Sequence, residues 1–406
     1  MGAGKTFALT GVYVWDGEAG ARSREPWTLR IRDEKIEAMG PQADLAAGVR
    51  SIPLSESTAL PGLIDAHVHL CLDPAIGPPA EQDAVPGPER IRAMEARAEA
   101  MLKSGITTAR DLGGGNGFEI ELRDRIARRA CAGPRLLCAG QPVTTPGGHC
   151  HFWGGEAEGP EEIRAVIRRQ IERRVDWIKV MATGGVMTRG TKPIAPQFDV
   201  SEIACVVEEA ARHGRSVAAH CHGTVGIANA VEAGVRTVEH CSFAGRAGFG
   251  ADFDAQVVER IARSGAWVSP TVNRGWGRRA FRKPENEGDP VPHSEFFERM
   301  QRVFEALRAA GVRLIASTDA GIPGVEHHRL AEALVAFAGY ADLSPLDVLR
   351  TATSQSADAL GIGNEVGRLR PGFQADILVV EGDPLVDLSV LQRPRAVVAA
   401  GELVTP

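Results

Sequence analysis

The sequence lacks several features that identify particular classes of protein. No uninterrupted apolar stretch approaches the roughly 20 residues that a membrane-spanning helix needs. Residues 1–16 contain neither a long apolar core nor a small-residue cleavage site, so we expect no secretory signal. The 46 basic residues are outnumbered by 52 acidic ones, and the net charge of −6 gives no indication of a nucleic-acid or membrane partner.

A disulfide framework is also lacking. The chain has seven cysteines, an odd number, and their spacing matches no disulfide scaffold. We therefore expect reduced thiols and a cytoplasmic location. Residues 2–6 (GAGKT) resemble the end of a phosphate-binding loop, but the first glycine of that motif and a preceding strand are missing, so we expect no nucleotide site there.

The 406 residues, 44% of them hydrophobic, are enough for a large domain and a smaller one. Between 60 and 364, short apolar segments alternate with longer amphipathic ones. The apolar segments predict eight strands, over 63–69, 106–112, 135–141, 177–181, 216–220, 237–240, 267–271 and 313–318. The amphipathic segments predict helices such as 89–103, 161–174, 201–213, 255–264, 295–310 and 327–339, with Ser201 as a start signal and Gly214 as a stop. This order favours an α/β fold, a (β/α)₈ TIM barrel, over a doubly wound sheet.

The two ends of the chain have a different pattern. Short β-like segments occur at 7–15, 27–32, 35–39, 375–380 and 396–399, separated by turn elements. Neither end is long enough for a core of its own, so we expect both to form one small β-sandwich beside the barrel. The predicted domains are therefore 1–59 plus 365–406 for the β-sandwich and 60–364 for the catalytic barrel.

Two histidines one residue apart end the first predicted barrel strand. Side chains two positions apart lie on the same face of a strand, so His67 and His69 can reach one metal ion together. An isolated pair of this kind is more often two ordinary strand histidines. Here four further candidate ligands lie at or near the ends of later strands: Lys179, His220, His240 and Asp319.

In (β/α)₈ enzymes the chemistry takes place at the carboxyl ends of the strands, where these six residues are expected to meet. Their nitrogen and oxygen donors suit zinc, although manganese, cobalt or iron could use the same set. Asp319 can bind a metal and accept a proton from a water whose pKa the metal lowers. A helix N-cap is the alternative role for Asp319.

Lys179 is the unusual member of the set, since an ammonium group is costly to bury in an apolar strand. A reaction with carbon dioxide would convert it to an anionic carbamate that can bridge two cations. The alternative, equally weighted from position alone, is a lysine that reaches a carboxylate at the barrel rim.

Further polar residues are candidates for contacting a substrate. His149 and His151 follow the third strand and could polarise a substrate carbonyl or line the pocket, with metal binding as the weaker alternative. His222 lies on the same strand face as His220 and could hydrogen-bond the substrate. Arg110 and Asp111 are expected to form a structural ion pair near the mouth of the barrel.

These residues resemble the motifs of the amidohydrolase superfamily over nearly the whole chain. The matching segments are 61–69 (PGLIDAHVH), 105–114 (GITTARDLGG), 178–185 (IKVMATGG), 219–223 (AHCHG), 239–240 (EH), 317–321 (STDAG) and 366–377 (VGRLRPGFQADI). Within the superfamily, the fourth-strand lysine followed by Ala-Thr-Gly-Gly is similar to the imidazolonepropionase-like branch. That branch includes Xaa-Pro dipeptidases, metal-dependent carboxypeptidases and ochratoxin-type amidases.

The resemblance implies a centre with two divalent metal ions, with zinc expected. His67, His69 and Asp319 would hold the more buried ion, His220 and His240 the other, and carbamylated Lys179 would bridge them. A hydroxide shared by both ions would attack the substrate carbonyl, with Asp319 as general base and then acid. Deamination is disfavoured, because the superfamily's deaminases usually carry a glutamate shortly after the fifth-strand histidine and this chain has none there.

The leading functional hypothesis is a hydrolase of amide bonds in dipeptides or N-acyl amino acids, with Arg189 or Arg274 holding the substrate carboxylate. One alternative is hydrolysis of another carbonyl compound, such as a lactone, a carbamate or a cyclic amide like an imidazolone, by the same site. A non-catalytic barrel protein is a further alternative, disfavoured because no ligand is missing. Relatives associate through barrel surfaces, so a homo-oligomer is possible, but no exposed apolar stripe marks an interface.

Overall fold

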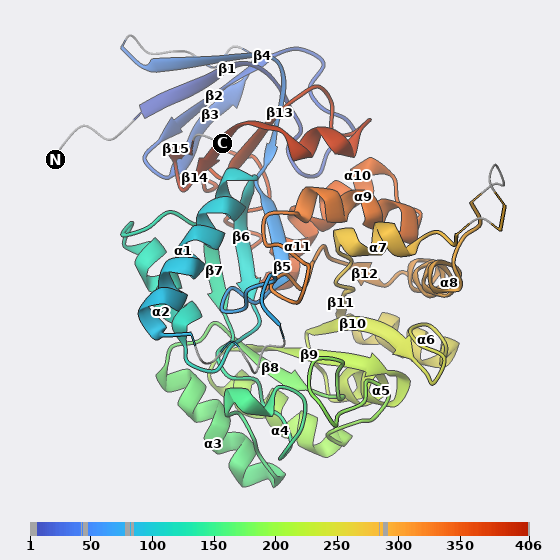
Figure 1. The fold of residues 1–406 in the computed structure, drawn as a ribbon. Coiled ribbons are helices and arrows are strands. Elements are labelled where there is room, and N and C mark those ends of the chain that lie inside the picture. Colours follow the sequence, from blue (N-terminus) through green and yellow to red (C-terminus); the bar gives the residue numbers. More distant parts are fainter. Residues whose placement is uncertain are drawn as a thin grey trace.

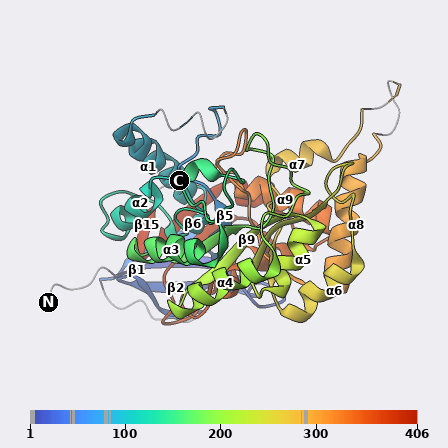
Figure 2. The same ribbon diagram turned by 90° about the horizontal axis from the view of Figure 1, so that it is seen from below.

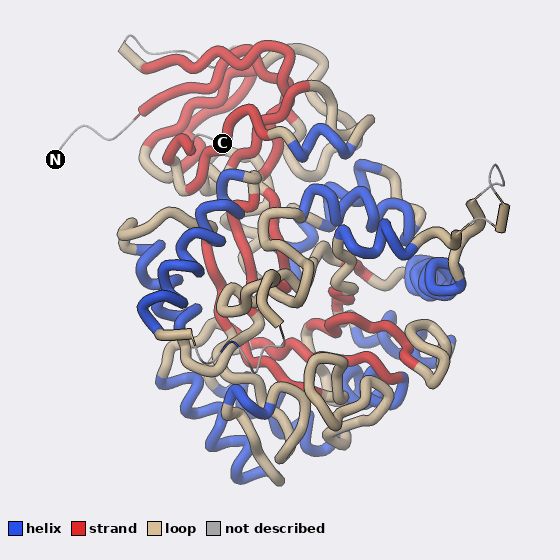
Figure 3. The backbone as a smooth tube through the Cα atoms, in the orientation of Figure 1, coloured by secondary structure: helices blue, strands red, loops and turns tan. Residues whose placement is uncertain are grey.

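A computed structural model describes residues 6–41, 43, 48–77, 82, 85–283, 285–286 and 291–404. The small sheet built from both ends of the chain lies at the top of Figure 1, and the barrel with its helices lies below it. In Figure 3, which colours strands red, these two groups of strands are separate in space. The arrangement confirms an α/β barrel accompanied by a small β-structure from the two termini.

Eight parallel strands form the barrel. They are β5 (Leu63–Val68), β6 (Ile106–Asp111), β7 (Arg135–Cys138), β8 (Trp177–Met181), β9 (Ser216–Gly223), β10 (Thr237–Ala244), β11 (Trp267–Ser269) and β12 (Arg313–Leu314). Continuous ladders join β5-β6-β7 and β8-β9-β10-β11-β12. The two remaining seams are closed by isolated parallel bridges, Val143 to Val180 and Val68 to Ala320. All eight strands lie where the sequence predicts them, and the barrel is closed.

The last two barrel strands are shorter than predicted. The strand expected over 267–271 ends at Ser269, and the one expected over 313–318 ends at Leu314. Thr271 and Asp319, two and five residues beyond these ends, adopt positive φ angles of 54° and 60°. The chain therefore leaves strand geometry at the residues that face the mouth of the barrel.

Helices cover the outside of the barrel, as Figure 2 shows from below for α3 to α6 and α8. Their bounds are α1 (Gly87–Lys103), α2 (Phe118–Ala127), α3 (Gly159–Glu172), α4 (Val200–Arg212), α5 (Thr224–Glu232), α6 (Ala255–Ser264), α7 (Arg274–Arg279), α8 (Glu295–Ala309), α9 (Leu330–Ala341), α10 (Pro345–Thr351) and α11 (Ser354–Leu360). Short 3₁₀ turns follow at η2 (His151–Trp153) and η3 (Leu388–Gln392).

The start of α4 corrects one prediction. The N-cap is Asp199 and not Ser201, because the Asp199 carboxylate accepts a hydrogen bond from the Glu202 backbone NH at 2.9 Å. The Glu202 carboxylate accepts one from the Asp199 NH at 3.0 Å in return, which completes a capping box. The helix predicted from residue 327 begins three residues later, at Leu330.

The small sheet has seven strands in the order β15-β14-β13-β4-β1-β2-β3. Their bounds are β1 (Thr6–Val14), β2 (Trp27–Arg32), β3 (Lys35–Gly40), β4 (Arg50–Pro61), β13 (Ile377–Glu381), β14 (Pro394–Ala399) and β15 (Glu402–Val404). Strand β4, which the sequence reasoning missed, pairs in parallel with β1 and antiparallel with β13. It therefore joins the two ends of the chain and leads directly into β5.

Gly62 makes the turn from the sheet into the barrel. Its NH donates to the Asp376 carbonyl at 2.9 Å, and a Cβ at this position would lie 2.1 Å from the Thr107 hydroxyl. No side chain fits there, so glycine is required by close approach. The turn fixes the start of β5 and hence the positions of His67 and His69.

Two further expectations concern the whole chain. All seven cysteines are free thiols, as predicted, and six of them are buried. Of the helices in the described ranges, none has the length and apolar character needed to cross a bilayer.

Candidate metal centre

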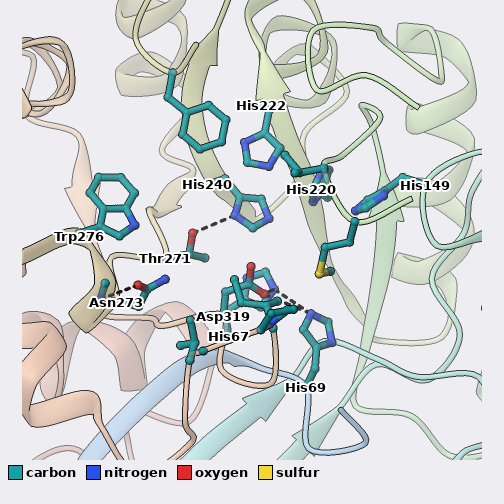
Figure 4. Close-up of a pocket in the computed structure, with 18 of the residues that line it drawn as sticks. His67, His69, His149, His220, His222, His240, Thr271, Asn273, Trp276 and Asp319 are labelled. Carbon is teal, nitrogen blue, oxygen red and sulfur yellow. Dashed lines mark hydrogen bonds and ion pairs between the residues drawn. The ribbon is translucent and has the colours of Figure 1, made fainter. Parts of the chain in front are cut away.

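A cavity of about 750 Å³ opens at the carboxyl ends of the barrel strands. All six predicted metal ligands line it: His67, His69, Lys179, His220, His240 and Asp319. The close-up in Figure 4 shows the labelled histidines gathered around one space, with Asp319 beside His67 and His69. The residues come from β5, β8, β9, β10 and the segment after β12, so the barrel brings together side chains that lie up to about 250 positions apart.

His67, His69 and Asp319 form the first group that can hold a metal ion. The Nε2 atoms of the two histidines are 3.3 Å apart. Asp319 Oδ1 lies 3.3 Å from His67 Nε2 and 3.4 Å from His69 Nε2. Three donor atoms at these mutual distances match the edges of a coordination shell with bonds of about 2.0–2.2 Å.

The backbone around Asp319 holds its carboxylate in this position. The Asp319 NH donates to the His67 carbonyl at 2.8 Å, which ties the segment to β5. Buried Asp65 accepts hydrogen bonds from the Thr318 NH at 3.1 Å and the Thr318 hydroxyl at 2.6 Å. The next helix begins only at Leu330, so the alternative role of Asp319 as a helix N-cap is wrong.

His220, His222 and His240 form a second group that can hold a metal ion, with ligand atoms within 4.8 Å of one another. One ring nitrogen of each is engaged: His220 Nε2 with the Gly184 carbonyl, His222 Nδ1 with the Ser242 hydroxyl, and His240 Nδ1 with the Thr271 hydroxyl. The other ring nitrogen remains available to a ligand. The structure thus adds His222, predicted as a substrate contact, to the side chains that could hold the second ion.

Burial lowers the pKa of His67 and of His222 to about 4 and that of His149 to about 3. At His69 burial is outweighed by the hydrogen bond and charge of Asp319, which raise its pKa. Neutral imidazole is the form that ligates metals, so the side chains with a lowered pKa are ready to bind ions at neutral pH without losing a proton.

Lys179 is fully buried, and its Nζ has no hydrogen-bond partner among the residues that the structure describes. No carboxylate of those residues lies within ion-pair distance, so the alternative of a lysine paired at the barrel rim finds no support. Burial lowers the pKa of Lys179 to about 8, against the opposing charges of Glu239 and Asp319. The neutral amine, which is the form that reacts with carbon dioxide, is therefore accessible near neutral pH.

Glu239 supports the centre from behind, and the sequence reasoning gave it no role. Its Oε2 accepts a hydrogen bond from His67 Nδ1 at 3.0 Å, which leaves His67 Nε2 for a metal. Its Oε1 accepts one from Arg110 at 2.8 Å, with both side chains fully buried. The signal available in the sequence was its position beside His240 in the Glu-His pair of β10.

The same contact corrects the prediction of an ion pair between Arg110 and Asp111. Arg110 points into the barrel, where it also donates to the Ala66 carbonyl at 2.7 Å and stacks over Trp177. Asp111 faces the other way and accepts from the Leu70 NH at 2.8 Å. Neighbouring side chains on a strand alternate in direction, so the two could not meet.

Replacing Glu239 by glutamine is expected to weaken metal binding by about 10- to 100-fold, because outer partners of metal-bound histidines contribute on this scale. Metal affinity measured by competition with a chelator tests this. Thr237→Val serves as the matched control: it removes a hydroxyl that donates to the same carboxylate and accepts from Arg110, but it leaves the bond between Glu239 and His67 in place. Unchanged affinity in Glu239→Gln would show that His67 needs no such support.

The predicted substrate contacts separate into two sets. His149 lines the cavity, with its Nδ1 2.9 Å from the Thr188 hydroxyl and its ring 4.6 Å from that of His220. His151 is half-buried in the turn η2 and is not among the lining residues. Arg189 is exposed and Arg274 is paired with Glu326 at 2.9 Å; neither lines the cavity. The expectation that one of these two arginines holds a substrate carboxylate stays a prediction, and the arginines that line the described cavity wall are Arg278 and Arg279.

A second buried acid, Glu119, lies in the first turn of α2. Both of its carboxylate oxygens are buried without a hydrogen-bond partner in the described part of the chain. Burial and the neighbouring charge of Asp111 raise the pKa of Glu119 from 4.5 to about 8. The pKa of Glu119 is thus higher in the folded protein than in the unfolded chain. Protonated Glu119 therefore contributes its full share of the free energy of unfolding below the pKa of the unfolded chain, and this share is lost as the pH rises toward 8.

Glu119→Gln keeps the shape of the side chain and removes this titration. We expect the free energy of unfolding at about pH 8 to exceed that of the wild type by roughly 3 kcal/mol, and the two proteins to be nearly equal below about pH 5. Urea denaturation at the two pH values measures the difference. A variant that is no more stable than the wild type at the higher pH would contradict the raised pKa.

Comparisons with known proteins agree with this geometry. The family model described as "Amidohydrolase family" matches residues 58–404. Ochratoxinase from Aspergillus niger is 29% identical over 411 residues, which cover 91% of this chain and 80% of that protein. A Xaa-Pro dipeptidase structure with bound methionine superimposes with a TM-score of 0.83 at 26% identity, covering 98% of this chain and 99% of the other. A prolidase complexed with N-methylphosphonate-L-proline also gives a TM-score of 0.83, at 25% identity and with the same coverage.

Proposed function

The chain belongs to the amidohydrolase family, and from this premise we propose that it hydrolyses amide bonds of dipeptides or N-acyl amino acids. The reaction would use two divalent metal ions, and we expect them to be zinc. The observation that carries the proposal is the geometry of three donor atoms. His67 Nε2, His69 Nε2 and Asp319 Oδ1 lie within 3.4 Å of one another. They share one cavity with Lys179, whose Nζ has no hydrogen-bond partner among the described residues. In this proposal Lys179 carries a carbamate that bridges the ions.

When bound, the ions would supply a water of lowered pKa and would polarise the substrate carbonyl. Asp319 would accept the proton of that water and pass it to the leaving amine. Burial opposes its ionisation, but the charges and hydrogen bond of His67 and His69 hold the pKa of Asp319 well below its usual range. Asp319 is therefore a carboxylate, ready to accept a proton, at neutral pH.

His149 would orient the substrate carbonyl. Its Nδ1 is engaged by Thr188, so Nε2 is the nitrogen that could face a ligand. A Cβ on Gly185 would lie 2.3 Å from the His149 ring, so the loop after β8 packs closely against the imidazole and restricts its movement.

Because His149 would contact the substrate and not the metal ions in this proposal, its loss should raise KM and lower kcat without releasing the metals.

The names of the related structures support an amino-acid amide as the substrate class. Methionine and N-methylphosphonate-L-proline, the ligands named for the two related structures, both contain an amino-acid unit. A site in this chain that is built on the same scaffold would accept a comparable unit.

Hydrolysis of a library of dipeptides and N-acyl amino acids by zinc-reconstituted protein tests the proposal. We expect cleavage with a clear side-chain preference, abolished by a chelator and restored by added zinc. A protein that holds about two metals per chain and cleaves none of these compounds would contradict it. Lactones, carbamates and cyclic amides assayed in parallel would then identify the alternative carbonyl substrate.

A further inference from the structure

We infer that Arg278 and Arg279, at the end of α7, bind a free carboxylate on the substrate. The inference rests on the proposed function and names the side chains that would hold the free carboxylate of its substrates. Both arginines line the cavity that contains Lys179 and Asp319. Within the part of the chain that the structure describes, they are the arginines of this cavity wall.

Helix α7 is fixed relative to the candidate metal centre. Asn273, its N-cap, donates from Nδ2 to the carbonyl of Thr318, the residue before Asp319, at 3.4 Å. Trp276 is buried, and its carbonyl accepts a hydrogen bond from the Tyr340 hydroxyl at 2.9 Å. Figure 4 shows Asn273 and Trp276 on the side of the cavity opposite His149. The helix can therefore present its last two side chains at a set position across the cavity.

The charges of Arg278 and Arg279 are not neutralised by the residues around them. Neither forms an ion pair with any carboxylate in the described ranges, and Arg279 lies over the ring of Phe296 at 5.6 Å. The neighbouring arginines are all paired: Arg274 with Glu326, Arg282 with Glu298 and Arg299 with Glu295. Two exposed guanidinium groups without a carboxylate partner give this part of the cavity wall a positive potential that attracts an anionic ligand.

The remaining wall of the cavity favours a carboxylate next to an apolar group. Phe249, Trp276 and Met187 also line it. Guanidinium groups match the planar geometry of a carboxylate, and the apolar side chains would receive the side chain of the same residue. An N-acylated apolar amino acid would thus place its amide toward Asp319 and its carboxylate toward α7.

Two compounds that differ only in the carboxylate provide the test: N-acetyl-L-phenylalanine and its amide. We expect wild-type enzyme to prefer the acid, and Arg278→Gln/Arg279→Gln to lose about 100-fold or more in kcat/KM on the acid, mostly through KM, with little change on the amide. Arg282→Gln is the matched control, an exposed arginine just beyond α7 that Glu298 neutralises. An unchanged preference in the double variant would overturn the inference.

A second experiment tests the carboxylate site without any reaction. Calorimetry measures the binding of L-phenylalanine and of L-phenylalaninamide to the zinc-loaded protein. We expect the amino acid to bind more tightly than its amide to the wild type, and this difference to vanish in the double variant. If the enzyme cleaves neither acetyl compound but the difference appears as expected, the carboxylate site stands and the proposed reaction fails. Equal binding of both ligands by wild type and variant would overturn the site.

Discussion

Lys179→Ala is expected to lower kcat/KM by about 100-fold or more and to reduce the metal content from about two ions per chain toward one. Removal of a residue that merely supports a metal ligand typically costs 10- to 100-fold, and loss of a bridging ligand should cost at least as much. Buried Lys179 Nζ has no hydrogen-bond partner among the described residues, so truncation of the side chain breaks no hydrogen bond with them. Metal analysis and steady-state kinetics on the purified variant measure both effects.

The control is Lys192→Ala, which removes an exposed lysine from the loop after the same strand. Short carboxylates such as propionate should partly restore metal content and activity to Lys179→Ala, because they can occupy the space of the carbamate. Isotopically labelled bicarbonate should label the wild type and the control but not the variant. Full activity with two bound ions in Lys179→Ala would remove this residue from the centre.

Asp319→Asn is expected to depress kcat by about 100-fold or more, as is typical when a proton-transfer group is lost. Asparagine keeps the size of the side chain. The backbone hydrogen bond from the NH of residue 319 to the His67 carbonyl also stays in place, so the fold should be retained. Because Asp319 Oδ1 lies within 3.4 Å of His67 and His69 Nε2, we also expect weaker binding of the first ion.

The assay must therefore separate metal loss from loss of proton transfer. Kinetics at saturating zinc report the loss of proton transfer alone, and circular dichroism shows whether the fold is retained. Asp252→Asn, at an exposed aspartate outside the cavity, is the control. Wild-type turnover by the zinc-saturated Asp319→Asn protein would exclude Asp319 from the reaction.

The strands and the helices between them were predictable because each depends on a local pattern. Apolar residues in short runs, bounded by turn residues, located all eight barrel strands, and amphipathic spacing located most of the long helices. Strand β4 was missed because residues 50–57 are mostly polar, and only Leu54 and Ser57 among them are buried, so this part contains no long apolar run. Helix α7 was missed because it has only six residues, fewer than two turns, and two of them are glycines, which disfavour a helix.

The placement of the six candidate ligands was also predictable, since it follows from one rule of the fold. When parallel strands close into a barrel, the residues that end each strand meet at the same mouth. His67, His69, His220 and His240 each stand at or near the end of a predicted strand. Their roles as ligands remain predictions, but their presence in one cavity follows from strand order alone.

Sequence by itself determined the kinds of side chain available at the mouth of the barrel and the strands that carry them. Tertiary structure alone decided which of them act on each other. The contact between His67 and Glu239 joins residues that are 172 positions apart in the sequence. Arg110 pairs with Glu239 and not with adjacent Asp111, because the side chains of Arg110 and Asp111 point in opposite directions. The loops likewise decided that Arg278 and Arg279, and not Arg189 or Arg274, line the cavity. Such contacts depend on the three-dimensional path of segments without a repeating pattern, which local periodicity does not encode.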